Sequence, residues 1–74
     1  MRITIKLFAT LRTRRFDIET LEFSPGVTID QVIKVLGIPE EEVTLIFVNG
    51  HHADIHDTLA DGDIIGLFPP VGGG

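Results

Sequence analysis

The sequence has no cysteine among its 74 residues. Disulfide bonds, thiolate catalysis and cysteine-based metal sites are therefore excluded, and any sulfur that the protein handles must come from another molecule. Basic residues are also scarce, because six Lys and Arg stand against eleven Asp and Glu, for a formal net charge of -5. This balance argues against a nucleic-acid backbone as the main partner.

The sequence also lacks the segments that send a chain to or through a membrane. It has no charged start followed by a short apolar run, as a signal peptide would, and no apolar run of the roughly 20 residues that span a bilayer. Internal repeats and linkers are absent as well. We therefore expect one small cytoplasmic domain over residues 1–71, with residues 72–74 as a flexible glycine tail.

Alternation of apolar and polar residues predicts a set of short strands. Five stretches read as strands: residues 2–8, 18–23, 43–48, 51–55 and 64–68. In the first stretch one face is aliphatic and is expected to be buried: Ile3, Ile5 and Leu7. Ile18 is out of phase with the rest of its stretch, which indicates a bulge or a late strand start. Asn49-Gly50 is a strong signal for a two-residue hairpin.

One amphipathic helix is predicted between the second and third strands. Thr28 is typical of a helix N-cap, and Gln31 three residues later completes a capping box. The residues at i, i+3, i+4 and i+7 then form one apolar stripe: Ile29, Val32, Ile33 and Leu36. Gly37 and Pro39 end the helix. The order β-β-α-β-β-β predicts an α+β roll, in which a mixed five-stranded sheet packs on one main helix.

Two phenylalanines are candidates for an interaction surface. Phe8 and Phe68 have the opposite phase to the core residues of their strands, so both rings are expected on the sheet face that the helix leaves open. An exposed apolar patch of this kind usually marks an interface. The alternative is that one or both rings fold over the sheet edge and pack internally. The run 43–48 also allows two interpretations. It is either buried on both sides or presents Leu45 or Phe47 to a partner.

Two clusters of basic residues are weaker candidates. Three arginines lie within residues 12–15, a pattern that favours a solvated loop over a phosphate site. His51, His52 and His56 raise the question of a metal site, but consecutive residues of a strand point to opposite faces. We therefore predict no metal site in this chain.

Four stretches resemble the β-grasp, ubiquitin-like sulfur-carrier proteins. They are "IKLFATLR" (5–12), "VTIDQVIKVLGIP" (27–39), "VNG" (48–50) and "LADGDIIGLFPPVGGG" (59–74). The resemblance is strongest to the small subunit of molybdopterin synthase, with the thiamine sulfur carrier second. The specific part is the ending, in which a strand and a Pro-Pro pair lead to glycines at the C-terminus. Gly72, which falls where a small residue varies in the family, and the basic segment 12–15 depart from the pattern.

The resemblance implies a carrier that catalyses nothing and binds no cofactor of its own. An adenylating enzyme supplies ATP and magnesium, activates the Gly74 carboxylate, and a sulfur donor converts it to a thiocarboxylate. Gly73 and Gly74 fit the narrow channel that this step needs. A large synthase subunit or a thiazole synthase then receives the sulfur. The residues expected to contact these partners are Phe8, Phe68, Pro69, Pro70, Val71 and Gly72. A ubiquitin-like modifier of lysines and a passive interaction module are the alternatives.

Overall fold

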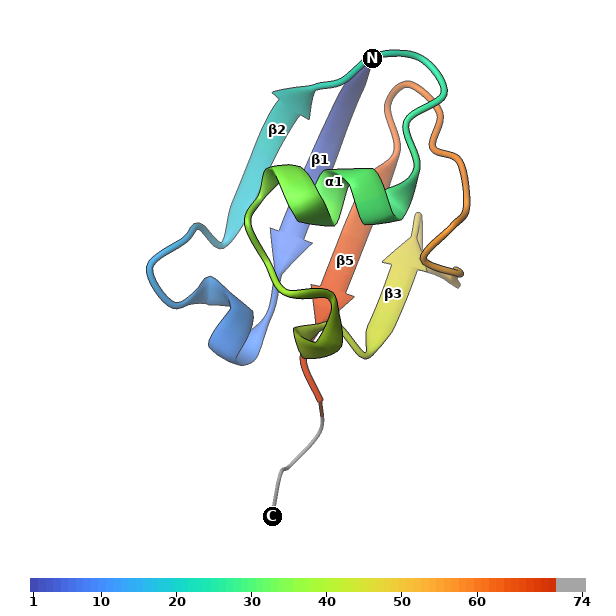
Figure 1. The fold of residues 1–74 in the computed structure, drawn as a ribbon. Helices are drawn as coiled ribbons and strands as arrows, with labels where there is room; N and C mark the ends of the chain where they lie inside the picture. Colours follow the sequence, from blue (N-terminus) through green and yellow to red (C-terminus); the bar gives the residue numbers. More distant parts are fainter. Residues whose placement is uncertain (71–74) are drawn as a thin grey trace.

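The computed structural model describes residues 1–70, which form a sheet and a single α-helix in the order predicted from the sequence (Figure 1). The elements are β1 (Arg2–Leu7), the 3-10 turn η1 (Ala9–Arg12), β2 (Ile18–Glu22), α1 (Ile29–Val35), the 3-10 turn η2 (Glu40–Glu42), β3 (Leu45–Val48), β4 (His51–His52) and β5 (Ile64–Phe68). The predicted boundary at residue 71/72 lies outside the described residues. No helix within residues 1–70 has the length and apolar character needed to cross a membrane.

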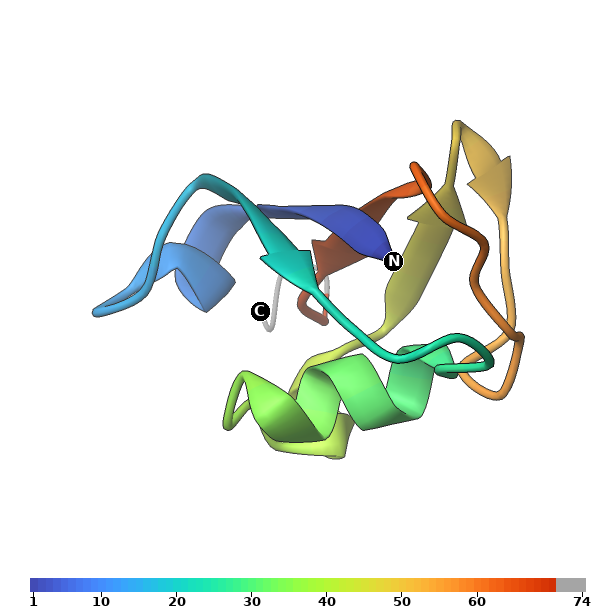
Figure 2. The ribbon, with the colours of Figure 1, turned by 90° about the horizontal axis from the view of Figure 1, so that it is seen from above.

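The sheet is mixed and has the strand order β2-β1-β5-β3-β4. β1 and β5 run parallel, whereas the other neighbouring pairs are antiparallel. The last strand of the chain therefore lies in the middle of the sheet, next to the first. Figure 2 shows α1 packed against one face of the sheet, so the opposite face, here called the open face, carries no helix within the described residues.

The core lies between α1 and the sheet, where the alternation in the sequence places it. The buried residues of these three elements are Ile3, Ile5 and Leu7 of β1, Ile65 and Leu67 of β5, and Ile29, Val32 and Ile33 of α1. Leu36 is only half-buried, although the apolar stripe predicts it in the core, because it caps the helix at its C-terminal end.

The segment after β1 contributes to the core as well, although its polar composition resembles that of a loop. Its first turn is the 3-10 turn η1, and Leu11 within it has no exposed surface. The N–H of Leu11 donates to the carbonyl of Phe8 at 3.1 Å, which closes the turn and directs the leucine inward. A single buried leucine among polar residues gives no periodic signal, so sequence reasoning missed it.

The predicted capping box at the start of α1 is confirmed. The N–H of Thr28 donates to Gln31 Oε1 at 3.0 Å, and the Thr28 hydroxyl also donates to the Asp30 carboxylate. The next two helical N–H groups, which would otherwise lack partners, donate to the carbonyls of Asp57 and Ile55 at 3.1 and 2.8 Å. The helix start is thus joined to the loop before β5.

The largest differences from the predicted strands lie at β3, at β4 and at Ile18. β4 is assigned only to His51–His52, although the Ala53 N–H donates once more to β3, at the Ile46 carbonyl. The strand goes no further because the chain then turns away to cap α1. β3 begins at Leu45 because Val43 still belongs to the end of η2. Ile18 needs neither a bulge nor a late start, since it pairs in register with Lys6 and lies on the open face.

Candidate functional site

The parallel pairing of β1 and β5 brings two distant parts of the chain to one end of the sheet. Both strands finish at the same end of the sheet, and β5 leads from there into Pro69 and Pro70 (Figure 1). The ladder extends one residue further, because the Phe8 N–H donates to the Leu67 carbonyl at 3.2 Å. Phe8 and Phe68 therefore meet at the point where β5 leads into Pro69 and Pro70.

The two rings stack on the open face. Their centroids are 4.2 Å apart and their planes differ by 4°. The ring of Phe47 stands edge-on to Phe68, at 5.7 Å and 81°. All three rings are half-buried and none belongs to the core, so the predicted placement of Phe8 and Phe68 is confirmed and the alternative of internal packing is wrong. Phe47 shares this face, so the structure decides the orientation that the sequence left open.

The rings of Phe8 and Phe68 pack against a glycine of β5, Gly66. A Cβ at Gly66 would lie 3.4 Å from Cε2 of Phe8 and 3.6 Å from Cε1 of Phe68, so the rings lie close to the bare backbone. Beside them is a shallow hollow of about 170 Å³, here called the aromatic hollow. It is lined by Lys6, Phe8, Phe47, Gly50, Ile64, Gly66 and Phe68. Sequence reasoning missed Gly66, although a glycine inside a strand marks a close approach of this kind.

Arg12 also lies over one of the stacked rings. Its guanidinium carbon lies 5.3 Å from the centre of the Phe8 ring, and its Nε donates to the Leu7 carbonyl at 2.6 Å. The same nitrogen lies 3.7 Å from an Asp17 carboxylate oxygen. Arg15 likewise donates to a carbonyl of its own loop, that of Leu11, at 3.2 Å. These contacts and the exposure of Arg12 and Arg14 support the interpretation of the arginine segment as a solvated loop.

The histidines do not come together. His51 and His52 pair with Val48 and Phe47 on β3, and the His52 ring stands edge-on to Phe47 at 5.8 Å. His56 lies in the loop beyond, with its Nδ1 3.9 Å from an Asp30 carboxylate oxygen. Within residues 1–70, no three His, Cys, Asp or Glu side chains converge where they would hold a metal ion.

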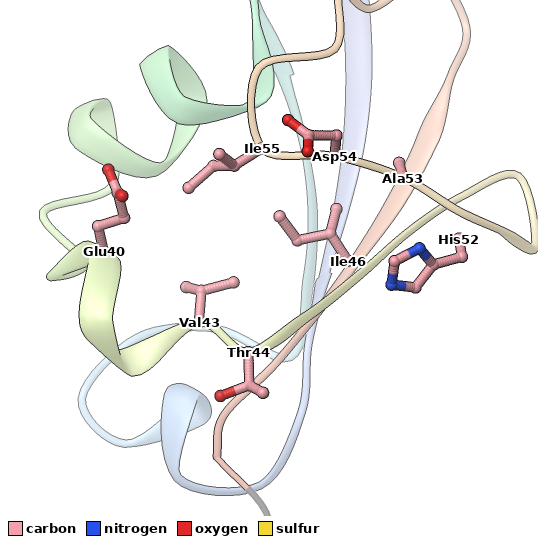
Figure 3. A pocket seen from close by; sticks show the side chains of 8 residues that line it. All are labelled: Glu40, Val43, Thr44, Ile46, His52, Ala53, Asp54 and Ile55. Carbon is pink, nitrogen blue, oxygen red and sulfur yellow. The ribbon is translucent and has the colours of Figure 1, made fainter.

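A second, larger groove of about 460 Å³ lies between η2, β3 and the residues that follow β4 (Figure 3). Val43, Ile46 and Ile55 form its apolar part, while Glu40 and Asp54 carry carboxylates at its margin. It begins at Thr44, whose N–H donates to the Phe68 carbonyl at 2.8 Å, so the groove adjoins the start of the tail. Its lining contains no nucleophile paired with a base.

The turn before β5 is braced by a side chain that sequence reasoning missed. Asn49 Oδ1 accepts the Ile64 N–H at 2.9 Å, and its Nδ2 donates to Asp63 Oδ1 at 2.9 Å. The other Asp63 oxygen accepts the Ala60 N–H at 2.8 Å. Asp63, and Asp61, whose Oδ1 accepts the Arg2 N–H at 2.7 Å, thus use their carboxylates to hold the turn.

The site therefore consists of a half-buried aromatic face and the start of a tail. Pro69 is half-buried and Pro70 is exposed where the chain leaves Phe68. The other predicted site residues, Val71, Gly72, Gly73 and Gly74, lie outside the described residues. The described part of the face offers aromatic rings, a lysine and backbone.

Comparison with known proteins agrees with this geometry. The sequence pattern of the ThiS family matches residues 5–74, whereas no curated protein sequence matches the chain. Three solved structures share the β-grasp fold. SAMP1 from Haloferax volcanii has a TM-score of 0.80 at 22% identity, with 100% of both chains covered. A protein proposed to be subunit 1 of the molybdopterin converting factor of Pyrococcus furiosus has a TM-score of 0.77 at 28% identity, covering 96% of this chain and 99% of that one. A chain from the complex of subunits 1 and 2 of the Helicobacter pylori molybdopterin-converting factor has a TM-score of 0.69 at 25% identity, with 100% of both chains covered.

Proposed function

This chain belongs to the ThiS family, a family of small ubiquitin-like sulfur carriers, and we propose that its Gly74 carboxylate carries sulfur for the synthesis of molybdopterin. The observation that carries the proposal is that the family match extends through Gly74, so the glycine tail is part of the family pattern. The chain itself then acts as a carrier and not as an enzyme. Its subunit role in a synthase complex is part of the same proposal.

The chemistry follows from the carboxylate. A carboxylate is a poor electrophile, so the Gly74 oxygen first attacks the α-phosphorus of ATP and displaces pyrophosphate, which gives an acyl-adenylate. Sulfur at the sulfide level then attacks the acyl carbon, the bond from that carbon to the AMP oxygen breaks, and the products are a thiocarboxylate and AMP. Adenylation makes this acyl transfer possible because AMP is a good leaving group. The activating partner provides ATP and magnesium, and this chain provides the acyl group.

The described residues supply the docking surface in this proposal. Phe8 and Phe68 present their stacked rings at the root of the tail, and Pro69 and Pro70 stiffen the chain that follows. Four residues remain beyond Pro70, and they span at most about 13–14 Å when extended. In this proposal, a partner that binds the open face has its adenylation site within about 13–14 Å of Pro70, where the Gly74 carboxylate can reach it.

Two partners are proposed, an adenylating enzyme and then the large subunit of a synthase. The solved H. pylori complex pairs subunit 1 with subunit 2 of the molybdopterin-converting factor, at 25% identity to this chain. Thiamine thiazole synthesis is the main alternative pathway, because the matching family is ThiS. Growth complementation of bacteria that lack one or the other carrier separates the two. A protein modifier would instead leave this chain on lysines, where mass spectrometry of cell extracts would find it.

The direct test is mass measurement after incubation with the cognate adenylating enzyme, ATP, magnesium and sulfide. Replacement of one oxygen by sulfur adds about 16 Da, as the acyl-transfer scheme requires. Deletion of Gly74, addition of one residue after it, and Gly73→Val should each prevent this gain, because a misplacement of about 1 Å can cost about 100-fold. Thermal unfolding of all three variants should match that of the wild type. A tail-deleted protein that still gains sulfur would refute the proposal.

A further inference from the structure

We propose that the aromatic hollow receives one large apolar side chain of the adenylating enzyme, and that a carboxylate beside that side chain pairs with Lys6. The inference rests on the proposed function and names the chemistry by which the partner is recognised. It is carried by the position of Lys6, which is the one charged residue that lines the hollow.

Lys6 lies within an apolar row that crosses the open face. The strand registers place Ile18, Lys6, Gly66 and Phe47 side by side on four neighbouring strands. Residues that pair across strands present their side chains on the same face. Ile18 is 57% exposed on one side of Lys6, and Ile64, 42% exposed, lines the hollow on the other. The lysine is therefore a cation flanked by apolar side chains along this row.

The size of the hollow limits what can enter it. Its volume is about 170 Å³ and it is open to solvent on one side. A shallow space of this kind suits the insertion of one large aliphatic or aromatic side chain. The floor of the hollow is Gly66, where the absence of a Cβ gives the depth.

The charges of the chain make Lys6 unusual. The net charge is -5, and a group of acids lies on α1 and on the segments beside it: Asp30, Glu40, Glu41, Glu42, Asp54 and Asp57. Among the lysines and arginines of the described strands, the other one is Arg2, which already lies 3.9 Å from the Glu22 carboxylate. Lys6 makes no ion pair with any group of residues 1–70.

Docking of a partner over this face removes water from Lys6. Burial of an unpaired ammonium group is strongly unfavourable, whereas a paired and hydrogen-bonded one is tolerated. A partner surface that covers Ile18 and the hollow together must therefore supply an anion between them. A carboxylate next to the inserted apolar side chain meets this need and also excludes partners with a basic residue at that point.

The test compares two charge reversals that change the net charge equally. Binding of each variant to the cognate adenylating enzyme is measured by titration calorimetry at two salt concentrations. Lys6→Glu should weaken binding about tenfold or more and reverse the salt dependence, because like charges then face each other. Lys34→Glu, on the exposed surface of α1, is the matched control and should change the affinity less than about threefold. Lys6→Arg should retain binding.

The hollow itself is tested by Gly66→Ala. The added methyl group would lie 3.4 and 3.6 Å from the two rings, which is ordinary van der Waals contact, so the fold should be kept and thermal unfolding should confirm it. The shallower hollow should weaken binding about tenfold, because the methyl group takes up space that the inserted side chain would fill. Unchanged affinity in Gly66→Ala would overturn the hollow as the docking point.

The outcomes separate this inference from the proposed function. If the wild type and Lys34→Glu both bind and gain sulfur, but Lys6→Glu binds as they do, the docking proposal is wrong and the carrier function stands. If the wild type neither binds the adenylating enzyme nor gains sulfur, the carrier function fails and the docking proposal fails with it. A tenfold or larger loss in Lys6→Glu alone supports the pairing.

Discussion

The rings of Phe8 and Phe68 lie parallel, with centroids 4.2 Å apart, although sixty residues separate them in the sequence. The contact exists because the first and last strands run side by side in the same direction and end at the same edge. It places a half-buried aromatic pair at the root of the tail, where it can serve either the stability of the fold or the docking of a partner. Substitution distinguishes these two roles.

Phe8→Ala and Phe68→Ala should weaken partner binding and cost little stability. A fully buried phenylalanine loses about 3–5 kcal/mol on truncation, but these rings are half-buried and their stacking is worth only about 0.5–1.5 kcal/mol. Urea unfolding should show a loss below about 3 kcal/mol for each. Ile65→Ala, fully buried on the strand that carries Phe68, is the control and should cost about 2–5 kcal/mol. A Phe68 loss equal to a buried ring's would place it in the core.

Leu11→Ala should be among the most destabilising changes in the molecule. The side chain is fully buried in η1, and truncation of such a leucine costs about 2–5 kcal/mol. The neighbouring exposed Thr10→Ala should change the free energy of unfolding by less than about 0.5 kcal/mol. Equal values for the two variants, measured by urea unfolding, would show that the turn packs loosely.

Asn49 should stabilise the hairpin in two separable ways. Its side chain makes two hydrogen bonds, each worth about 0.5–1.5 kcal/mol, and its backbone has a φ of 51°. Asn49→Gly removes only the hydrogen bonds, whereas Asn49→Ala also forces a left-handed conformation on alanine, which costs about 1–2 kcal/mol more. Alanine should therefore be the less stable variant in thermal unfolding. The reverse order would mean that the backbone strain is negligible.

Asp30 should contribute stability that depends on pH. A hydrogen bond from the Thr28 hydroxyl, helped by the charges of His56 and Lys34 against partial burial, lowers the pKa of Asp30 below its ordinary value of 3.8. A carboxyl group with a lowered pKa stabilises the fold above its unfolded pKa, and this contribution is lost as the pH falls through the folded pKa. Asp30→Asn should therefore be less stable at pH 7, and the difference in melting temperature should shrink below about pH 4. A constant difference down to pH 2 would contradict the mechanism.

Local patterns in the sequence were sufficient for most of the fold. The alternation in β1 predicts its buried face, and Thr28 with Gln31 predicts the start of α1, because each signal involves near neighbours in the chain. The extent of β4 was not predictable in this way. That strand ends at His52 because the following residues are needed at the start of α1, and only the folded chain brings these two segments together.

The site was predictable where phase alone decides orientation, as for Phe8 and Phe68. Phe47 was left undecided because residues 43–48 are apolar at nearly every position and have no phase. The sequence alone does not show that Gly66 and Lys6 belong to one surface, because only the register of β1 and β5 places them side by side. The bridge from Asn49 to Asp63 was missed for the same reason, since it joins side chains of two separate turns.

The central position of β5 also has a mechanical consequence. β5 is bonded along its length to β1 on one side and to β3 on the other. A pull along its axis would load both ladders in shear, and because their hydrogen bonds run across the strands, many must break together and not one after another. An edge strand such as β2 has one ladder only. The domain therefore resists traction best along the direction in which its last strand runs.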